Sequence, residues 1–182
     1  SGDATDLADA LAGTINYTGN VTVTDNAYTV AELVAINAGT TGSITLNTAN
    51  VALSGTVANI KLAFAGTITT HTGTLEISDA GTTDITATDI TSINTTNTGT
   101  ITVANTIDIN GSGSEVEAAF AAIDTNTGNA TANITGTDYT VAQLKAINAA
   151  TSGAIVLADA SGSLSGTVAN IKLAFAGTIT TV

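Results

Sequence analysis

The stretch that decides the fold is Tyr28–Thr70, YTVAELVAINAGTTGSITLNTANVALSGTVANIKLAFAGTITT. It returns, shifted by 111 positions, as Tyr139–Thr181, with 32 of its 43 positions unchanged. A repeat on this scale shows that the chain was built by copying a structural unit. We call Tyr28–Thr70 the first copy and Tyr139–Thr181 the second copy. Because stacked units bury their core against their neighbours, we expect one array over residues 1–182.

A shorter theme inside the repeat marks helix starts: a Ser or Thr is followed three positions later by an acid or an amide. The hydroxyl accepts from a free backbone amide of the first turn, and a Glu or Gln can bond back to the cap residue. The pairs are Thr29/Glu32, Thr56/Asn59, Thr86/Asp89, Ser114/Glu117, Thr140/Gln143 and Thr167/Asn170. Successive starts are separated by 27, 30, 28, 26 and 27 positions. This spacing predicts windings of about 28 residues, four to each long repeat and six to seven in the chain.

Residues that tolerate the left-handed conformation predict where each helix stops. They are Ile15-Asn16, Ile36-Asn37, Ile93-Asn94, Ile123-Asp124, Ile147-Asn148, Gly66 and Gly177. From cap to stop the distances run 8, 10, 8, 10, 8 and 10 positions, so we expect short and long helices to alternate. Each helix carries one apolar stripe at helical spacing, and the three Phe are interpreted as core. The first helix, around Leu7 and Leu11, is the counterpart of the one at Val116 and Phe120.

Short runs that alternate apolar and polar residues lie between the helices and predict half-buried strands. They are Ile44–Leu46, Val51–Leu53, Leu75–Ile77, Ile101–Val103, Ile107–Ile109 and Ile155–Leu157. One winding therefore contains two short strands and one short capped helix, and equivalent strands of successive windings should pair in parallel. We expect an α/β-solenoid. The alternative is a compact α/β domain with an internal duplication.

The composition narrows the function classes. Fifteen carboxylates face only Lys61, Lys145 and Lys172, with no Arg, for a formal net charge of -12. Such a chain repels nucleic acid and lacks the bidentate clamp for phosphate or carboxylate substrates. The absence of Cys removes disulfide and thiol chemistry. No run of eighteen apolar residues and no basic-apolar leader is present, so we expect no membrane span, and the mid-pattern ends predict a piece of something longer.

Phrases such as TVAELVAINAGTTGSITL and LSGTVANIKLAFAG resemble the repeat units of giant repetitive cell-surface proteins of marine cyanobacteria, of the kind associated with swimming without flagella. The resemblance implies an extracellular, cell-surface location, export without disulfides, and a role as a long spacer or surface layer. It brings no functional residue with it. The calcium-binding nonapeptide motif of other exported repeat proteins is missing.

Two candidate sites come from titratable residues. The densest acidic stretch, Asp79–Asp89, spreads Asp79, Asp84 and Asp89 over eleven positions without a bidentate Glu, so turn and cap roles explain these residues better than a dedicated calcium site. Loose calcium binding to the acidic surface stays open. His71 is the only histidine and has no partners for a triad or a zinc site, so we interpret it as a solvated loop residue.

Three further signals have simple structural explanations. Thr-x-Thr pairs that could organise water fall at irregular places, so we interpret them as solvent-facing strand residues: Thr22/Thr24, Thr67/Thr69, Thr100/Thr102 and Thr178/Thr180. Tyr28 and Tyr139 precede helix caps and are expected to staple the first turn rather than stack on carbohydrate. Lys61 and Lys172 are expected to lay their stems over the core edge.

The sequence thus predicts a non-enzymatic structural segment without catalytic, cofactor-binding or metal-binding residues and without a small-molecule substrate. Its expected partners are neighbouring repeats of the parent protein, with end-to-end stacking between molecules at the bare ends. Two alternatives stay open. One is an adhesin that grips glycan, a surface or ice through one face, and the other is a polysaccharide-cleaving solenoid enzyme, which the lack of Arg disfavours.

Overall fold

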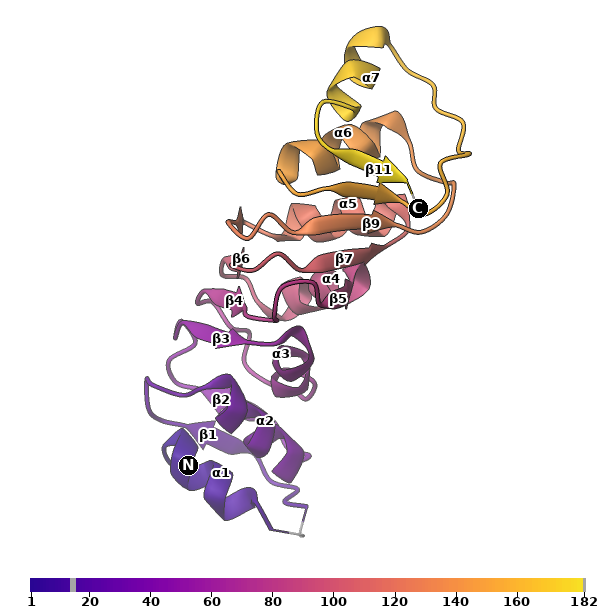
Figure 1. Cartoon of the computed structure of the whole chain (residues 1–182). Helices are drawn as coiled ribbons and strands as arrows, with labels where there is room; N and C mark the ends of the chain where they lie inside the picture. The colour runs from indigo at the N-terminus through magenta and orange to yellow at the C-terminus, as the bar shows by residue number, and fades with distance from the viewer. Residues whose placement is uncertain (14–15, 182) are drawn as a thin grey trace. The chain divides into compact units, whose positions relative to one another are not determined.

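The computed structural model describes residues 1–13 and 16–181, and it shows a mixed α/β fold with parallel sheets (Figure 1). The chain forms two compact units. The first unit comprises Ser1–Ile77 with Ser92–Ile101, and the second comprises Ser78–Thr91 with Thr102–Val182. The first copy lies in the first unit and the second copy in the second.

The first unit holds α1 (Ala4–Leu11), β1 (Val21–Val23), α2 (Val30–Gly39), β2 (Ile44–Leu46), β3 (Leu53–Gly55), α3 (Val57–Ala63) and β4 (Leu75–Ile77). The boundary between the units falls within α4 (Ala87–Thr96) and β6 (Ile101–Val103). The second unit holds β5 (Asp84–Thr86), β7 (Asp108–Gly111), α5 (Gly113–Ala122), β8 (Thr125–Asn126), β9 (Thr131–Ile134), α6 (Val141–Ala150), β10 (Ile155–Leu157), α7 (Val168–Ala174) and β11 (Ile179–Thr181).

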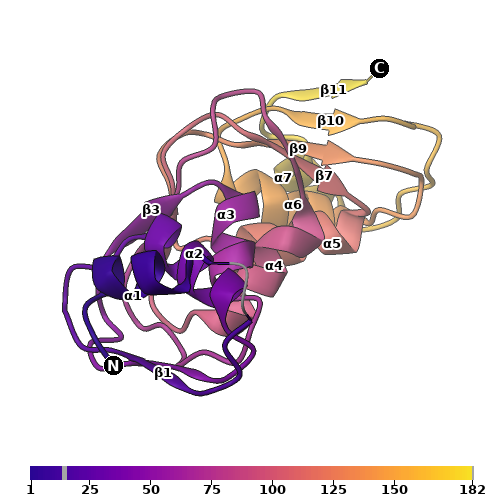
Figure 2. The same cartoon turned by 90° about the horizontal axis from the view of Figure 1, so that it is seen from below.

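Neighbouring strands pair in parallel, as the sequence predicts. In the first unit β1 pairs with β2 and β3 with β4, and in the second unit five strands follow the order β11-β10-β9-β7-β5 (Figure 2). Val21 lies opposite Ile44, Leu53 opposite Leu75 and Ile155 opposite Ile179, so paired residues stand 22 to 24 positions apart. These separations are shorter than the 26 to 30 positions between the predicted helix starts, although the parallel bridge between His71 and Asn97 spans 26 positions. Helix starts do not mark a fixed point in each winding, because α4 directly follows β5 whereas residues 135–140 separate β9 from α6.

Most of the predicted helix caps are confirmed. The side chains of Thr29, Thr56, Thr140 and Thr167 each accept from the backbone amide three residues on, and Thr29 and Thr140 form complete capping boxes. The predicted cap at Ser114 is wrong, because Ser112 caps α5 and Glu115 closes the box. Ser112 and Ser114 both fit the sequence pattern of a helix cap, and the structure uses Ser112. Gly113 is then buried in the first turn of α5 and packs against Tyr139, at a distance that leaves no room for a Cβ.

Most of the predicted helix stops are wrong, although α5 ends at Ala122, directly before the predicted stop at Ile123-Asp124. Asn37, Asn94 and Asn148 lie inside α2, α4 and α6, and α2 has ten residues whereas α3 has seven, the reverse of the predicted alternation. The only positive backbone φ angles in the described part of the chain are at Thr82, Asn129 and Gly136, so the predicted stop residues do not adopt the left-handed conformation. The stop at Ile15-Asn16 includes Ile15, which lies outside the described residues.

The strand predictions are partly correct. β2, β4, β6 and β10 have the predicted bounds, whereas β3 and β7 begin two and one residues later than the alternating runs. The alternating runs do not predict β1, β5, β8, β9 and β11. Strands β5, β8 and β11 contain at most one aliphatic residue each, and they become strands because a neighbouring strand supplies the backbone partner. β1 and β9 each bury two apolar residues in alternation.

The core is aliphatic and lies between helices and strands of the same unit. In the five-stranded sheet Ile85, Ile109, Ala132, Ile155 and Ile179 stand side by side on the inner face. Helices α1, α2 and α3 pack in succession in the first unit, as α5, α6 and α7 do in the second. Phe64 and Phe120 are buried, but the prediction that all three Phe are core is wrong because Phe175 is 44 % exposed.

Candidate functional site

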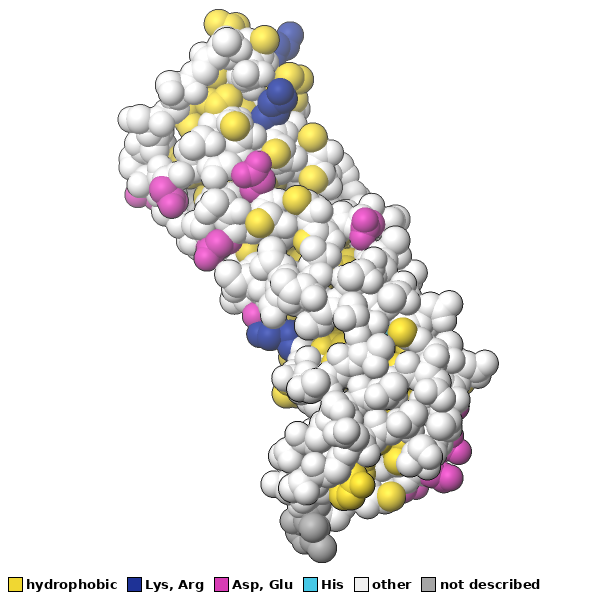
Figure 3. Space-filling model, turned by 180° about the vertical axis from the view of Figure 1, so that it is seen from behind, with side chains coloured by type: hydrophobic (Ala, Val, Ile, Leu, Met, Phe, Trp, Pro, Cys, Tyr) yellow, Lys and Arg dark blue, Asp and Glu magenta, His cyan; other side chains and the backbone are white. Residues whose placement is uncertain are grey.

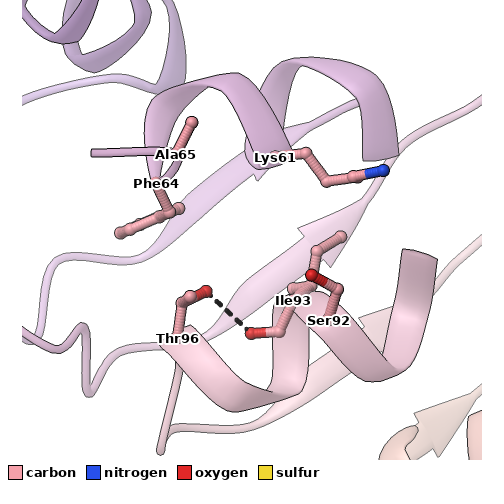
Figure 4. Close-up of a pocket in the computed structure, with 6 residues that line it drawn as sticks. All are labelled: Lys61, Phe64, Ala65, Ser92, Ile93 and Thr96. Carbon is pink, nitrogen blue, oxygen red and sulfur yellow. Dashed lines mark hydrogen bonds between the residues drawn. The ribbon is translucent and has the colours of Figure 1, made fainter. Parts of the chain in front are cut away.

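A shallow cavity of about 310 Å³ lies between α3 and the end of α4 in the first unit (Figure 4). Phe64 and Ile93 form its apolar walls, and Lys61 is its one charged lining residue. The hydroxyl of Thr96 donates to the carbonyl of Ile93 within α4 and is thus engaged in its own helix.

His71 is fully buried, so its interpretation as a solvated loop residue is wrong. Its Nδ1 lies 2.9 Å from Oδ1 of Asn97, and its Nε2 lies 2.7 Å from the carbonyl oxygen of Val51. Gly99 fixes the Asn97 amide, because its N–H donates to Oδ1 and its carbonyl accepts from Nδ2. Both ring nitrogens therefore face acceptors, and a neutral imidazole has a proton for only one of them.

The His71 ring also packs on Phe64, with the ring centroids 5.6 Å apart. His71 forms a parallel bridge with Asn97, and its backbone N–H donates to the carbonyl of Thr96. The residue thus joins three consecutive parts of the first unit: the loop before β3, α3 and the end of α4. These contacts connect segments that lie 20 to 26 positions apart in the sequence.

The three Asp of the acidic stretch do not converge. The Asp79 carbonyl accepts from Nδ2 of Asn105, Asp84 accepts from Nδ2 of Asn110, and Asp89 lies in the first turn of α4. Asp84 stands directly opposite Asp108 in the β5–β7 pair, which brings two carboxylates side by side. Among residues 1–13 and 16–181, no three His, Cys, Asp or Glu side chains form a group that could hold a metal ion.

The threonines do not form a continuous row. In the first unit Thr22 stands opposite Thr45. The corresponding row of the five-stranded sheet changes residue type from strand to strand: it runs Thr86, Asn110, Asn133, Val156 and Thr180. An extended flat array of hydroxyls is therefore not built.

Tyr28 and Tyr139 are almost fully buried, at 2 % and 3 % exposure, which leaves no ring face for a sugar. The Tyr28 hydroxyl donates to the carbonyl of Thr48 at 2.6 Å, and that of Tyr139 donates to the carbonyl of Asp159 at 3.0 Å. Burial, together with the charge of Asp25, raises the pKa of Tyr28 to about 12. Each tyrosine thus reaches from a helix start to the turn after the next strand.

The three lysines are exposed, and two of them, Lys145 and Lys172, lie on α6 and α7. Figure 3 shows lysine side chains (dark blue) beside hydrophobic ones (yellow) on one face of the molecule. A hollow of about 410 Å³ between α6 and α7 is lined by Val141, Lys145, Gly166 and Asn170, among others. The Nζ of Lys145 donates to Oδ1 of Asn170, so this lysine bridges two successive helices.

Two Asn side chains that are equivalent in the two copies connect one helix to the next. Nδ2 of Asn37 donates to the carbonyl of Leu62 at the end of α3, and Nδ2 of Asn148 donates to that of Leu173 at the end of α7. A Cβ at Gly66 or Gly177 would collide with the side-chain oxygen of the Asn. All four residues fit the pattern of helix stops. The two Asn instead lie inside their helices, and the two Gly follow the ends of α3 and α7 without the left-handed conformation. The sequence signal for this contact is that the Asn and the Gly recur together, at the same separation, in both copies.

A second recurring contact lies at the turn after α2 and α6. The hydroxyl of Thr40 donates to carbonyls of the preceding winding at Tyr17 and Gly19, and that of Thr151 donates to the carbonyl of Ala130. Each threonine oxygen also accepts from the backbone amide two residues on. These amides belong to glycines, and the close approach to the preceding backbone leaves no room for a Cβ.

Carboxylates with perturbed pKa values are local cap and turn residues. Hydrogen bonds from the Thr5 and Thr29 side chains and from the Thr29 amide lower the pKa of Glu32 against the opposing effect of desolvation. The Ser112 amide and hydroxyl lower the pKa of Glu115 in the same way. Ser161 lowers the pKa of Asp159. Glu115 and Asp159 are thus stabilised in their ionised forms by their own turns, whereas Glu32 is stabilised first by Thr5 of α1 and then by its cap residue Thr29.

Within the part of the chain that the structure describes, no helix has the length and hydropathy to cross a membrane. Comparisons of the chain with protein-family models, with curated proteins and with solved structures gave no match. The functional interpretation therefore depends on the contacts described above.

Proposed function

We propose that residues 1–182 form one regular α/β-solenoid and serve as a structural spacer in a very large exported cell-surface protein. In this role the chain is not an enzyme and acts in the extracellular space, in a surface layer or in a motility-associated assembly. Its partners are the neighbouring windings of the same parent protein. Calcium binds only loosely to the acidic surface.

One observation carries the proposal: the residues that the sequence repeats are those that bind one winding to the next. Asn37 and Asn148 bind the following helix, Thr40 and Thr151 bind the preceding turn, and parallel strands pair at 22 to 24 positions. Selection for contacts between neighbours is what an array needs, since each unit of a repeat protein is stabilised mainly by its neighbours.

The charge supports the extracellular assignment. A formal net charge of -12 keeps long chains apart and soluble. In saline surroundings the repulsion is screened beyond about 8 to 10 Å, which limits its cost to folding.

Lengthening the array tests the proposal. Residues 28–138 are inserted a second time directly after Asp138, which adds one long repeat in register. Small-angle scattering should show a longer particle with an unchanged cross-section. A cross-section that grows with the insertion, or a near-spherical particle for the natural chain, would contradict the solenoid.

End-to-end stacking is part of the same proposal. At the C-terminal end of the second unit, Val168 and Phe175 are exposed, and such apolar surface favours contact with another molecule. Sedimentation at increasing concentration should show reversible association. Substituting Val168→Asp should abolish it, and a natural chain that stays monomeric at millimolar concentration would refute the stacking.

A further inference from the structure

The segments Leu53–Thr70 and Leu164–Thr181, the twin segments, have the same sequence but different surroundings. Val57 is 3 % exposed, whereas its twin Val168 is 84 % exposed. Phe64 is 5 % exposed, whereas its twin Phe175 is 44 % exposed. The exposed face of α7 is therefore one that the same sequence buries elsewhere in this molecule.

The first unit shows what covers this face. The strand β4 pairs in parallel with β3, so that Leu75 stands opposite Leu53 and Ile77 opposite Gly55. Ile93 of α4 and Phe64 at the end of α3 line one cavity (Figure 4). His71 packs on the Phe64 ring. Residues 71–77 and 92–101 thus supply both a strand and a helical cover.

The second unit lacks both parts of this cover among its described residues. The twin of β3, residues 164–166, forms no strand, and its Leu164 is only half-buried. A matched pair shows that the difference is specific: Leu62 and Leu173 lie on the outer side of their helices and are 54 % and 50 % exposed. The exposed fraction differs between the twin segments only for side chains on the side that would face the next winding.

We propose that residues 164–166 together with Val168, Ile171 and Phe175 form a docking surface for a further winding of the type formed by residues 71–101. The partner adds a parallel strand to the free backbone of residues 164–166, which is recognition by strand addition. It also covers Phe175 with an aliphatic helix residue equivalent to Ile93. This inference rests on the proposed solenoid and adds the type of winding that docks on α7.

A second molecule of this chain is a poorer fit for the same surface. Its free winding contains α1, whose Leu7 and Leu11 correspond to Val116 and Phe120 of α5. In the chain, α5 follows α4 rather than α3. If α1 of a second molecule stacked on α7, the type of winding that covers the twin segment in the first unit would be missing. End-to-end stacking is therefore a weaker contact than docking of a winding of the type formed by residues 71–101.

The test extends the chain by one winding. Residues 71–101 are appended directly after Thr181, which is the repeat equivalent of Thr70. The matched control carries Leu75→Asp, Ile77→Asp and Ile93→Asp in the appended winding only. Hydrogen exchange is followed by mass spectrometry on peptides from residues 164–175, with residues 53–64 of the same molecule as the internal standard.

We expect the appended winding to slow exchange in residues 164–175 by about tenfold or more, towards the rate of residues 53–64, and the control to leave it unchanged. Equal exchange in the extended chain, the control and the natural chain would overturn the proposal. Equal protection in the natural chain at high concentration would also overturn it, because a second molecule would then be the occupant. Scattering from the natural chain tests the solenoid independently of either result.

Discussion

The twin segments Leu53–Thr70 and Leu164–Thr181 compare one sequence in two settings. Both form a seven-residue helix, α3 or α7, behind the same threonine cap, and both accept the same Asn side chain at the helix end. Only the first forms the strand β3 and buries its Val and Phe. Helix and cap are thus local properties of the sequence, whereas the strand and the burial depend on the next winding.

The largest difference in stability between the twin segments is expected for substitutions of Phe64 and Phe175. Phe64→Ala should reduce the free energy of unfolding of the first unit by about 3 to 5 kcal/mol, because it removes a ring that is almost fully buried. Phe175→Ala should cost about 1 kcal/mol or less, because its ring is partly solvated. Denaturant unfolding of both variants measures the difference.

The control for this pair is Leu62→Ala against Leu173→Ala. Both leucines are about half exposed, so both substitutions should have small and similar effects. Equal costs for the two Phe variants, or unequal costs for the two Leu variants, would show that the difference in exposure does not govern stability.

A smaller effect is expected at the asparagine contacts, and here the two copies should agree. Asn37→Ala and Asn148→Ala each remove one hydrogen bond to a helix-end carbonyl, which typically costs about 1 kcal/mol. The donor comes from the preceding helix, which is present in both copies. Thermal or denaturant unfolding should give similar losses, and a loss confined to Asn37→Ala would mean that α7 is not docked on α6.

The smallest expected effect is a difference between the two copies in how the stability of one helix cap depends on pH. Glu32 closes the capping box of α2, whereas Gln143 closes that of α6. Because hydrogen bonds from Thr5 and Thr29 lower the pKa of Glu32 in the folded state, its contribution is present above the unfolded-state pKa and is lost as the pH falls through the folded-state pKa. Glu32→Gln should reduce the acid-induced loss of stability, measured as the urea midpoint at neutral and acidic pH.

The corresponding Gln143→Glu change tests the same contact in the other direction. It should introduce an acid-dependent loss in the second unit that the natural chain lacks at this cap. If Glu32→Gln leaves the acid dependence of the urea midpoint unchanged, the Glu32 carboxylate contributes nothing through its cap.

The caps at Thr29, Thr56, Thr140 and Thr167 were predictable because the pattern involves residues only three positions apart. The choice of Ser112 over Ser114 was not, since it depends on Gly113 packing on Tyr139, which belongs to a later part of the chain. The periodicity of the sequence also predicts the parallel pairing of strands. The spacing predicted for the helix starts agrees with the observed caps, whereas paired strands stand only 22 to 24 positions apart, because the loops between strands and helices differ in length.

The contacts between windings were the least predictable part. Asn37 and Asn148 have the composition of a helix stop, and only the structure shows that their amides reach the next helix. His71 lies in a polar, Thr-rich loop, yet Asn97 and Val51 enclose it from distant positions, and Phe64 packs on its ring. The hydrogen-bond partners of all three residues lie in another winding, beyond the reach of a local pattern.

The central claim is that each winding is held by the winding that follows it. Hydrogen exchange in the natural chain at low concentration tests it most directly, because the twin segments have identical intrinsic exchange rates. The account predicts that residues 53–64 exchange more slowly than residues 164–175 by about tenfold or more. Equal rates in the two segments would contradict it.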